Sequence, residues 1–224
     1  EFRRVLFRSA ANASPVTPPY NTVPNIHVET VPMVNPVGVS HWRSVAKSGG
    51  IYVQESFVDE LAEAAKMDPI AFRRQVFAKN PRALAVLDRI AREVNWQPIN
   101  WGKKPDGNGW GVGYADMGYG AMGAIAIQLS VDAKKKIQIK RIVSVTDQGV
   151  TVNPDISHAQ VQGGIIDGLS STMFGQITLK NGRVQQSNFG DYRMATLREA
   201  PPIESILIDS KERPGSMSEM STPL

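Results

Sequence analysis

Apolar residues recur with a helical period through much of the first half of the chain. In residues 51–67, the apolar positions Phe57, Leu61 and Ala64 or Ala65 share one face, and acidic residues occupy the other face. This spacing is typical of an amphipathic helix whose apolar face packs on a core. We therefore predict a helix over residues 51–67.

Two Asx-Pro pairs mark the starts of two further predicted helices. Asp68 precedes Pro69, and Asn80 precedes Pro81. A side-chain oxygen followed by proline is typical of an N-cap and a first helical turn, where the missing N–H of proline costs nothing. The predicted apolar faces are Ile70, Phe72, Val76 and Phe77 in the second helix, and Leu84, Leu87, Ile90, Ala91 and Val94 in the third.

The segments that flank these helices lack a helical period. Residues 10–40 contain several prolines, which forbid a regular helix, and we predict an extended lead-in with a strand near residues 27–31. Residues 95–109 are rich in tryptophan, proline and glycine, and they predict a connector.

After Gly109 the pattern changes to alternation and to β-branched runs, which are typical of strands. Asn181-Gly182 predicts a tight hairpin between two of these strands. One long helix is predicted from about residue 154 to residue 172. The predicted strands are 110–116, 122–131, 136–146, 174–179, 183–187 and 203–209. This order predicts an α+β fold (mixed α/β), with a helical N-terminal part followed by a mixed β-sheet with one long helix.

The composition excludes several kinds of site. The chain has 224 residues, of which 42% are hydrophobic and 21% charged, as is typical of a globular protein. It contains no cysteine, so it supplies no disulfide, no thiolate metal site and no iron–sulfur ligand. It contains only three histidines, which argues against a histidine metal centre.

The net charge argues against a nucleic-acid partner. Residues 1–9 look like translated sequencing-adapter DNA, and we expect them to be non-native. Without their three arginines and one glutamate, the remaining 22 basic and 20 acidic residues leave a net charge of +2. The basic run Lys134-Lys135-Lys136 lies in a predicted hairpin turn, where a solvated turn is favoured over a phosphate-binding patch. The end at 221–224 falls inside a motif, so we expect a piece of a longer protein.

Residues 143–169 form the most informative block of the sequence. An apolar strand reaches Asp147-Gln148-Gly149, a turn follows, and a helix then carries Gln160 and the glycines Gly163, Gly164 and Gly168. Each glycine inside a helix costs about 1 kcal/mol relative to alanine. The glycines therefore predict that something bulky lies against this helix, either another backbone or a ligand.

Two more segments complete the pattern. Trp42-Arg43-Ser44-Val45 precedes the first predicted helix, and residues 214–224 read Pro-Gly-Ser-Met-Ser-Glu-Met-Ser-Thr-Pro-Leu. Together with the 143–169 block, these segments resemble the large subunit of the xanthine dehydrogenase/aldehyde oxidase family, nearest to the isoquinoline oxidoreductase type. The resemblance covers roughly residues 18–224. It implies that residues 10–108 are the lead-in and helical part of a molybdopterin-binding domain, and that residues 109–224 are its sheet and helix part, truncated at the C-terminus.

The resemblance implies a role for individual residues. Glu219 matches the family's catalytic base, which removes a proton while oxygen is added to the substrate. Cofactor-binding roles are implied for Gln160, Arg43, Ser44, Gly163 and Gly164, and no protein ligand to the metal is implied, because the pterin holds it.

Each of these roles has a simpler alternative. Glu219 could be a solvated residue of a frayed terminus, Arg43 a surface arginine, and Gln160 a helix-start residue bonded to local backbone. Trp42 is more consistent with packing than with substrate binding. Serines at positions 216, 218 and 221 replace glycines of the family loop, which would strain the loop if those positions required positive φ.

The resemblance finally implies a function. The parent protein would be a molybdenum hydroxylase that uses water-derived oxygen to hydroxylate N-heteroaromatic or aldehyde substrates. Its cofactor would be molybdenum–molybdopterin in the cytosine dinucleotide form, and its partner a small [2Fe–2S] ferredoxin-like subunit. The chain alone is expected to be inactive. The alternative is a non-catalytic or degenerate paralogue or structural subunit, and both cytoplasmic and periplasmic locations remain open.

Overall fold

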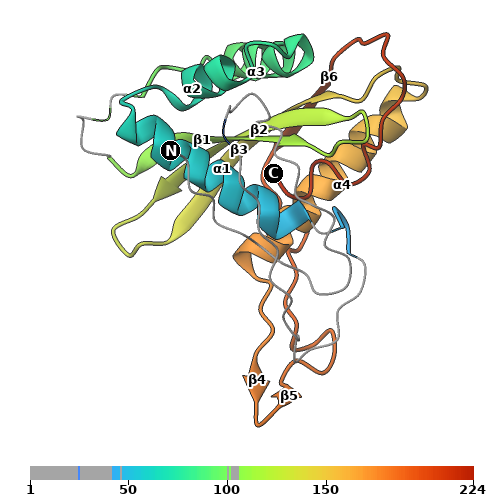
Figure 1. Ribbon diagram of the computed structural model, residues 1–224. Helices are drawn as coiled ribbons and strands as arrows, with labels where there is room; N and C mark the ends of the chain where they lie inside the picture. The colour runs from blue at the N-terminus through green and yellow to red at the C-terminus, as the bar shows by residue number, and fades with distance from the viewer. Residues whose placement is uncertain (1–24, 26–41, 46, 100, 102–105) are drawn as a thin grey trace.

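The computed structural model describes residues 25, 42–45, 47–99, 101 and 106–224 (Figure 1). The predicted non-native segment 1–9, the extended lead-in over 10–40 and the strand near 27–31 lie outside the described residues, apart from residue 25. The helices are α1 (Lys47–Ala64), α2 (Pro69–Val76), α3 (Pro81–Glu93) and α4 (Pro154–Met173). The strands are β1 (Asn108–Asp116), β2 (Met122–Val131), β3 (Ile137–Asp147), β4 (Leu179–Lys180), β5 (Arg183–Val184) and β6 (Ile203–Leu207).

The predicted N-caps of α2 and α3 are confirmed. Asp68 Oδ1 accepts hydrogen bonds of 3.0 Å from the backbone N–H groups of Ile70 and Ala71. Asn80 Oδ1 accepts one of 3.1 Å from Ala83 N–H. These bonds satisfy N–H groups that have no partner within their helix, so both chain turns are fixed by local sequence.

The predicted apolar face of α1 is wrong by about a quarter turn. Its buried residues are Ile51, Glu55, Val58 and Ala62, whereas Phe57 is only half-buried and Ala64 is exposed. The reason is that the buried face contains a charged residue. Glu55 pairs with Arg73 of α2, whose side chain is 0% exposed, at 2.9 Å. A carboxylate on the core side interrupts the apolar stripe from which the helix face was predicted.

The main sheet is mixed and is covered on both faces, which confirms the α+β class. Its strand order is β1-β2-β3-β6; β1, β2 and β3 pair antiparallel, and β6 pairs parallel to β3. Helices α2 and α3 cover one face, while α4 crosses the other (Figure 1). The first layer is held by a cluster that includes Phe77, Leu87, Ile90, Tyr114 and Val145. The second is held by Ile125, Ile142, Val161 and Ile165.

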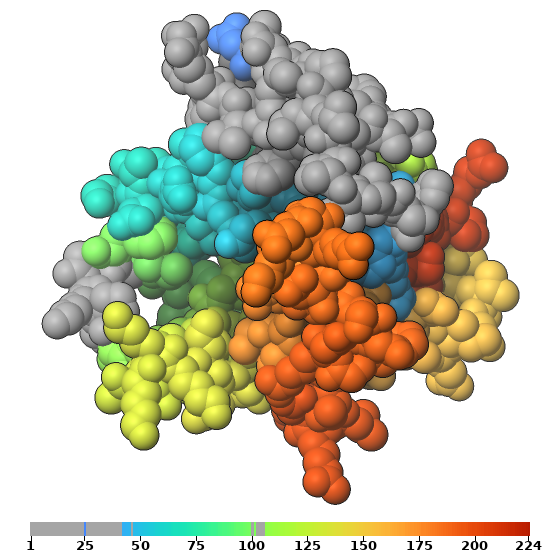
Figure 2. Space-filling model, turned by 90° about the horizontal axis from the view of Figure 1, so that it is seen from below, coloured from blue at the N-terminus to red at the C-terminus, as the bar shows by residue number. Residues whose placement is uncertain are grey.

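The predicted strands at 174–179 and 183–187 are largely absent. Only two residue pairs form a ladder there, around the Asn181-Gly182 turn, where both residues have positive φ as a tight hairpin requires. The β4–β5 arm (residues 174–199) extends away from the main sheet, and Figure 2 shows it in orange at the surface. Its apolar residues are exposed, with Leu179 at 47% and Phe189 at 89%, so no packing surface among the described residues extends these strands.

Candidate functional site

The C-terminal strap (residues 213–224) crosses the end of the sheet at which β1 and β3 finish. Gly215 N–H donates to Gln148 O at 2.7 Å, and Ser216 N–H donates to Tyr119 O at 3.1 Å. These bonds tie the strap to the end of β3 and to the turn between β1 and β2. The strap thereby lies beside the 143–169 block, from which it is far removed in sequence.

Glycines make this crossing possible. Gly149 has φ +76°, and a Cβ at this position would overlap Arg213 O of the strap. Gly120 has φ +84°, and its Cβ would lie 3.3 Å from Gly215 Cα. The positive φ disfavours a larger residue at both turns, and at Gly149 the overlap with the strap excludes one as well.

The strap bends sharply around Glu219. Met220 N–H donates to Met217 O at 3.4 Å, and Thr222 N–H donates to Glu219 O at 3.3 Å. Glu219 is half-buried, whereas Met220 is completely buried. The bend therefore anchors one side chain in the core and leaves the neighbouring carboxylate partly accessible.

Arg43 joins the strap to α4. Its Nε donates to Ser218 O at 2.5 Å, and its Nη2 donates to Gln160 O at 2.9 Å and to Gln160 Oε1 at 3.1 Å. The three sequence segments that carry the family resemblance thus meet at one guanidinium group. The sequence analysis implied a cofactor-binding role for Arg43 but did not predict that its side chain joins the three segments.

Gln160 is oriented by the same contact. Because its Oε1 accepts from Arg43, its amide NH₂ points away from the guanidinium. Gln160 is exposed, and within the described residues its Nε2 makes no hydrogen bond. The described residues therefore leave the donor hydrogens of this amide unused.

The Arg43 loop ends in a strained turn. Ser44 and Val45 have φ +74° and +52°, and Ser44 O accepts from Lys47 N–H at 3.0 Å as α1 begins. Each such non-glycine residue costs about 1–3 kcal/mol, and this kind of strain is common at ligand sites. Ser44 is fully buried, and its side chain pairs with Ser48 Oγ.

The glycines of α4 face protein atoms. A Cβ at Gly164 would overlap Ser221 Oγ, and a Cβ at Gly168 would overlap Thr222 O. At Gly163 the nearest atom would be Arg43 Nη1, at 3.7 Å. The bulky neighbour that the sequence predicted is therefore the strap at two of these positions. The cofactor contacts implied for Gly163 and Gly164 stay predictions.

The three strap serines are not strained. Among the described residues, Ser216, Ser218 and Ser221 are absent from those with positive φ. Ser221 is accommodated because Gly164 opposite it lacks a side chain. The expectation that serine would strain this loop is therefore not supported by its backbone angles.

Arg82 of α3 and Asp147 at the end of β3 form a partly buried ion pair that the sequence analysis did not predict. Arg82 Nε and Nη2 donate to the two carboxylate oxygens, each at 2.7 Å, and Nη2 also donates to Gly120 O at 2.9 Å. Burial opposes ionisation of Asp147, but bonds from Arg82 and Gly149 N–H outweigh it and hold the pKa of Asp147 below its usual range. The available signal was an acidic residue at the end of an apolar strand.

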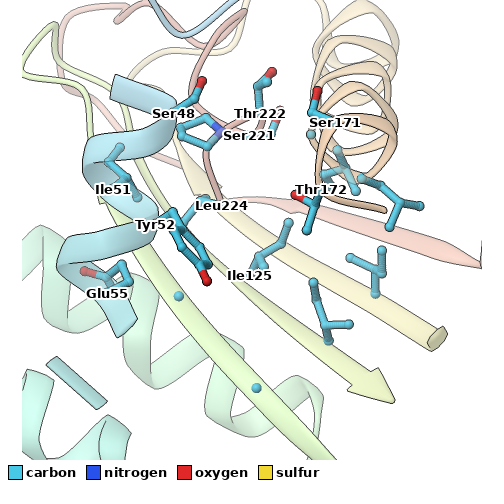
Figure 3. Close-up of a pocket in the computed structure, with 18 of the residues that line it drawn as sticks. Ser48, Ile51, Tyr52, Glu55, Ile125, Ser171, Thr172, Ser221, Thr222 and Leu224 are labelled. Atoms are coloured by element: carbon cyan, nitrogen blue, oxygen red, sulfur yellow. The ribbon is translucent and has the colours of Figure 1, made fainter. Parts of the chain in front are cut away.

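An apolar groove of about 540 Å³ lies on the other side of the strap (Figure 3). Ser48, Ile51 and Tyr52 of α1 form one wall, Ser171 and Thr172 of α4 the other, and Ile125 lies on the floor. Ser221, Thr222 and Leu224 of the strap close one end. Arg43, Gln160 and Glu219 lie outside this lining. The strap therefore separates the Arg43 junction from the groove.

The described residues supply no metal ligand cluster. They contain no group of three or more His, Asp or Glu side chains that could hold a metal ion. Within the same residues, no helix is long and apolar enough to cross a membrane.

Molybdopterin fits the donor set at the Arg43 junction. A pterin bears carbonyl and ring-nitrogen acceptors, and its phosphate is an anion; such groups require N–H donors and positive charge. Arg43 supplies the charge, and the NH₂ of Gln160, which donates to none of the described residues, supplies an oriented donor. The dithiolene of the pterin would hold the metal, so a protein ligand cluster is not required there.

The comparisons with known proteins define the class of this chain. Residues 38–201 match the molybdopterin cofactor-binding domain family, and the chain belongs to it. This confirms the resemblance inferred from the three motifs.

Several relatives belong to the same group. The beta subunit of isoquinoline 1-oxidoreductase from Brevundimonas diminuta is 28% identical over 225 residues, covering 96% of this chain and 28% of that protein. A nicotinate dehydrogenase subunit of Pseudomonas putida is 28% identical over 221 residues, covering 92% and 18%. The xanthine dehydrogenase molybdenum-binding subunit of Escherichia coli O157:H7 is 35% identical over 95 residues, covering 41% and 13%. The chain thus spans less than a third of the length of each relative.

Solved structures give a weaker match. CO dehydrogenase from Oligotropha carboxidovorans has a TM-score of 0.43 and 22% identity, covering 46% of this chain and 14% of that chain. Quinoline 2-oxidoreductase from Pseudomonas putida 86 has a TM-score of 0.42 and 20% identity, covering 46% and 14%. The family assignment accordingly rests on the sequence match.

Proposed function

We propose that this chain is the part of a molybdenum hydroxylase large subunit that carries the catalytic base and one wall of the cofactor site. The observation that carries the proposal is the Arg43 junction. Its guanidinium donates to the Gln160 side chain of α4, and thereby orients that amide, and it also donates to the carbonyl of Ser218 in the strap. Glu219 is the residue that directly follows Ser218 in the sequence.

Each residue has a stated task in this proposal. Arg43 and Gln160 orient the cofactor through a positive charge and an amide donor. The backbone of Ser44, Gly163 and Gly164 lies alongside it. Glu219 accepts the proton that is released when water-derived oxygen is added to the substrate, for which it must stand within hydrogen-bond reach of that oxygen. Bound molybdopterin would supply the two-electron redox chemistry.

The substrates and partners follow from the relatives. Their names point to N-heteroaromatic compounds, nicotinate and isoquinoline among them, and to aldehydes. We infer that the cofactor is the cytosine dinucleotide form. We further propose that electrons pass to a [2Fe–2S] cluster on a separate subunit; this chain contains no cysteine and does not bind the cluster itself.

The decisive experiment compares two glutamate variants in the cofactor-loaded holoenzyme. Glu219→Gln should lower kcat by about 100- to 10,000-fold, because a general base contributes that much, while molybdenum and pterin contents stay unchanged. The matched control is Glu212→Gln, an exposed glutamate just before the strap, which should keep parental activity. Isoquinoline and benzaldehyde with an electron-accepting dye are suitable probes, and ¹⁸O-labelled water should label the product.

Near-parental turnover by Glu219→Gln would refute the assigned role. The competing function, a non-catalytic paralogue, predicts a different result. In that case the parental protein binds molybdopterin but does not turn over either probe, and Glu219→Gln changes nothing.

A further inference from the structure

Met220 is the fully buried residue that directly follows Glu219. Its side chain is 0% exposed and packs with Ile51 of α1 and Ala115 of β1. Gly123 of β2 provides the room, because a Cβ there would lie 2.5 Å from Met220 Sδ and 2.8 Å from Cε. Met220 therefore fills a socket that exists because β2 carries no side chain at position 123.

The residues around Glu219 are held from several sides. On the preceding side, Ser218 O accepts a hydrogen bond of 2.5 Å from Arg43 Nε. On the following side, the carbonyl of Thr222 lies against Gly168 of α4. Glu219 thus lies between the hydrogen-bonded Ser218 and the buried Met220, and these two contacts restrict its backbone.

The hydrogen bonds within the bend are too long to define it alone. Met220 N–H to Met217 O is 3.4 Å, and Thr222 N–H to Glu219 O is 3.3 Å, both beyond the usual range for such bonds. The buried side chain of Met220 is therefore one of the anchors of the bend, besides the Arg43–Ser218 bond and the packing of Thr222 on α4.

We propose that Met220 is a positioning residue for Glu219. Its side chain in the Gly123 socket sets the bend from which the Glu219 carboxylate extends. This inference rests on the proposed role of Glu219 as the base. Met220 contacts neither substrate nor cofactor in this scheme and acts only through its neighbour.

Shortening Met220 should move the carboxylate without removing it. Met220→Ala empties the socket and lets the bend shift, and a displacement near 1 Å costs up to about 100-fold in rate. Met220→Leu keeps the apolar volume, and exchanges of this kind are well tolerated in cores. The substrate contacts stay intact, so KM should change little.

The experiment measures the variants in the cofactor-loaded holoenzyme. Met220→Ala should lower kcat by about 10- to 100-fold with KM and molybdenum content unchanged, and Met220→Leu should stay within about 3-fold of the parent. The matched control is Met194→Ala, a methionine that is 49% exposed on the β4–β5 arm and should leave kcat unchanged. Parental kcat in Met220→Ala would overturn the proposal.

A double-mutant cycle with Glu219→Gln separates positioning from general destabilisation. If Met220 acts through Glu219, adding Met220→Ala to Glu219→Gln should lower kcat no further. Multiplying losses would overturn the positioning role and leave Glu219 as the base. A Glu219→Gln variant with parental activity would instead overturn the proposed function itself.

Hydrogen–deuterium exchange provides a readout that does not depend on turnover. Gly123→Ala adds a Cβ that would lie 2.5 Å from Met220 Sδ and 2.9 Å from Val145 O, so it should displace the methionine side chain and raise the exchange of amides 216–222. Met220→Ala, which leaves β2 unchanged, should raise the exchange of the same amides. The matched control is Gly113→Ala on β1, where the nearest atom, Leu224 Cδ2, would be at an ordinary 3.6 Å. Equal exchange in Gly123→Ala and Gly113→Ala would contradict the socket.

Discussion

Replacing two glycines of the same helix by alanine should change the stability of the protein in opposite directions. Gly163 and Gly168 both lie inside α4, where alanine is favoured over glycine by about 1 kcal/mol on helix propensity. At Gly163 the new Cβ would meet only Arg43 Nη1, at 3.7 Å. Gly163→Ala should therefore stabilise the protein by about 0.5–1 kcal/mol.

At Gly168 the new methyl group meets backbone. It would overlap the carbonyl oxygen of Thr222 and lie 3.1 Å from its carbon, so a main-chain shift is required. Overpacking of this kind costs about 1–3 kcal/mol, which exceeds the propensity gain. Gly168→Ala should be destabilised by up to about 2 kcal/mol, and because both variants gain the same helix propensity, it should be about 1–3 kcal/mol less stable than Gly163→Ala.

Gly164 supplies an internal check on this reasoning. Its new Cβ would overlap Ser221 Oγ, a side-chain atom that is buried and without a hydrogen-bond partner among the described residues. Ser221→Ala removes the obstructing atom, so the double variant should recover most of the stability lost in Gly164→Ala. No single side-chain deletion should rescue Gly168→Ala.

Urea unfolding, followed by tryptophan fluorescence and circular dichroism, measures these differences. The midpoint should shift while the slope stays constant, because the surface exposed on unfolding does not change. Equal stability of Gly163→Ala and Gly168→Ala would refute the claim that the strap backbone lies against α4.

The remaining predictions concern charged pairs. Asp147→Asn should lower the free energy of unfolding at pH 7 by about 2–3 kcal/mol. This value lies between those typical of exposed and of buried ion pairs, because the partner Arg82 is 25% exposed. The pKa of Asp147 is lower in the folded than in the unfolded protein, so its contribution to stability is complete above the unfolded pKa of about 3.9 and is lost as pH falls through the folded pKa. A stability difference between wild type and Asp147→Asn that is as large at pH 2 as at pH 7 would contradict this. Glu55→Gln should cost about 2–3 kcal/mol in urea unfolding, because it removes one of the two carboxylates, with Asp59, that pair with the buried Arg73, and a loss below 1 kcal/mol would argue against that pair. Arg141→Ala breaks only an exposed pair and should change the thermal midpoint by less than about 3 °C, so a larger drop would show an unrecognised role.

Local signals in the sequence predicted the starts of α2, α3 and α4 and the class of fold, but placed the start of α1 at residue 51 instead of Lys47. The caps at Asp68, Asn80 and Asn153 all accept hydrogen bonds from their own first turns, so each is determined by residues a few positions away. The face of α1 could not be predicted, because Glu55 is buried by a partner 18 residues away. A burial pattern that depends on pairing is not visible in hydrophobicity alone.

The candidate site was predicted only in part. The sequence placed Arg43, Gln160 and Glu219 in three separate motifs, but it did not show that one side chain connects them. The glycines of α4 indicated a close neighbour without identifying it. The strap that fills this space comes from the end of the chain, so periodicity within the helix carries no information about it.

The Arg43 junction also has a consequence for the order of folding. Its hydrogen bonds span 117 residues to Gln160 and 175 residues to Ser218. Closing loops of that length is entropically costly, and contacts distant in sequence slow folding. The helical layer and the β1–β2–β3 meander can pack from near neighbours. An early intermediate would then hold an intact hydrophobic interior while Glu219 is still untethered, so the Arg43 junction should be the last contact that a refolding chain regains.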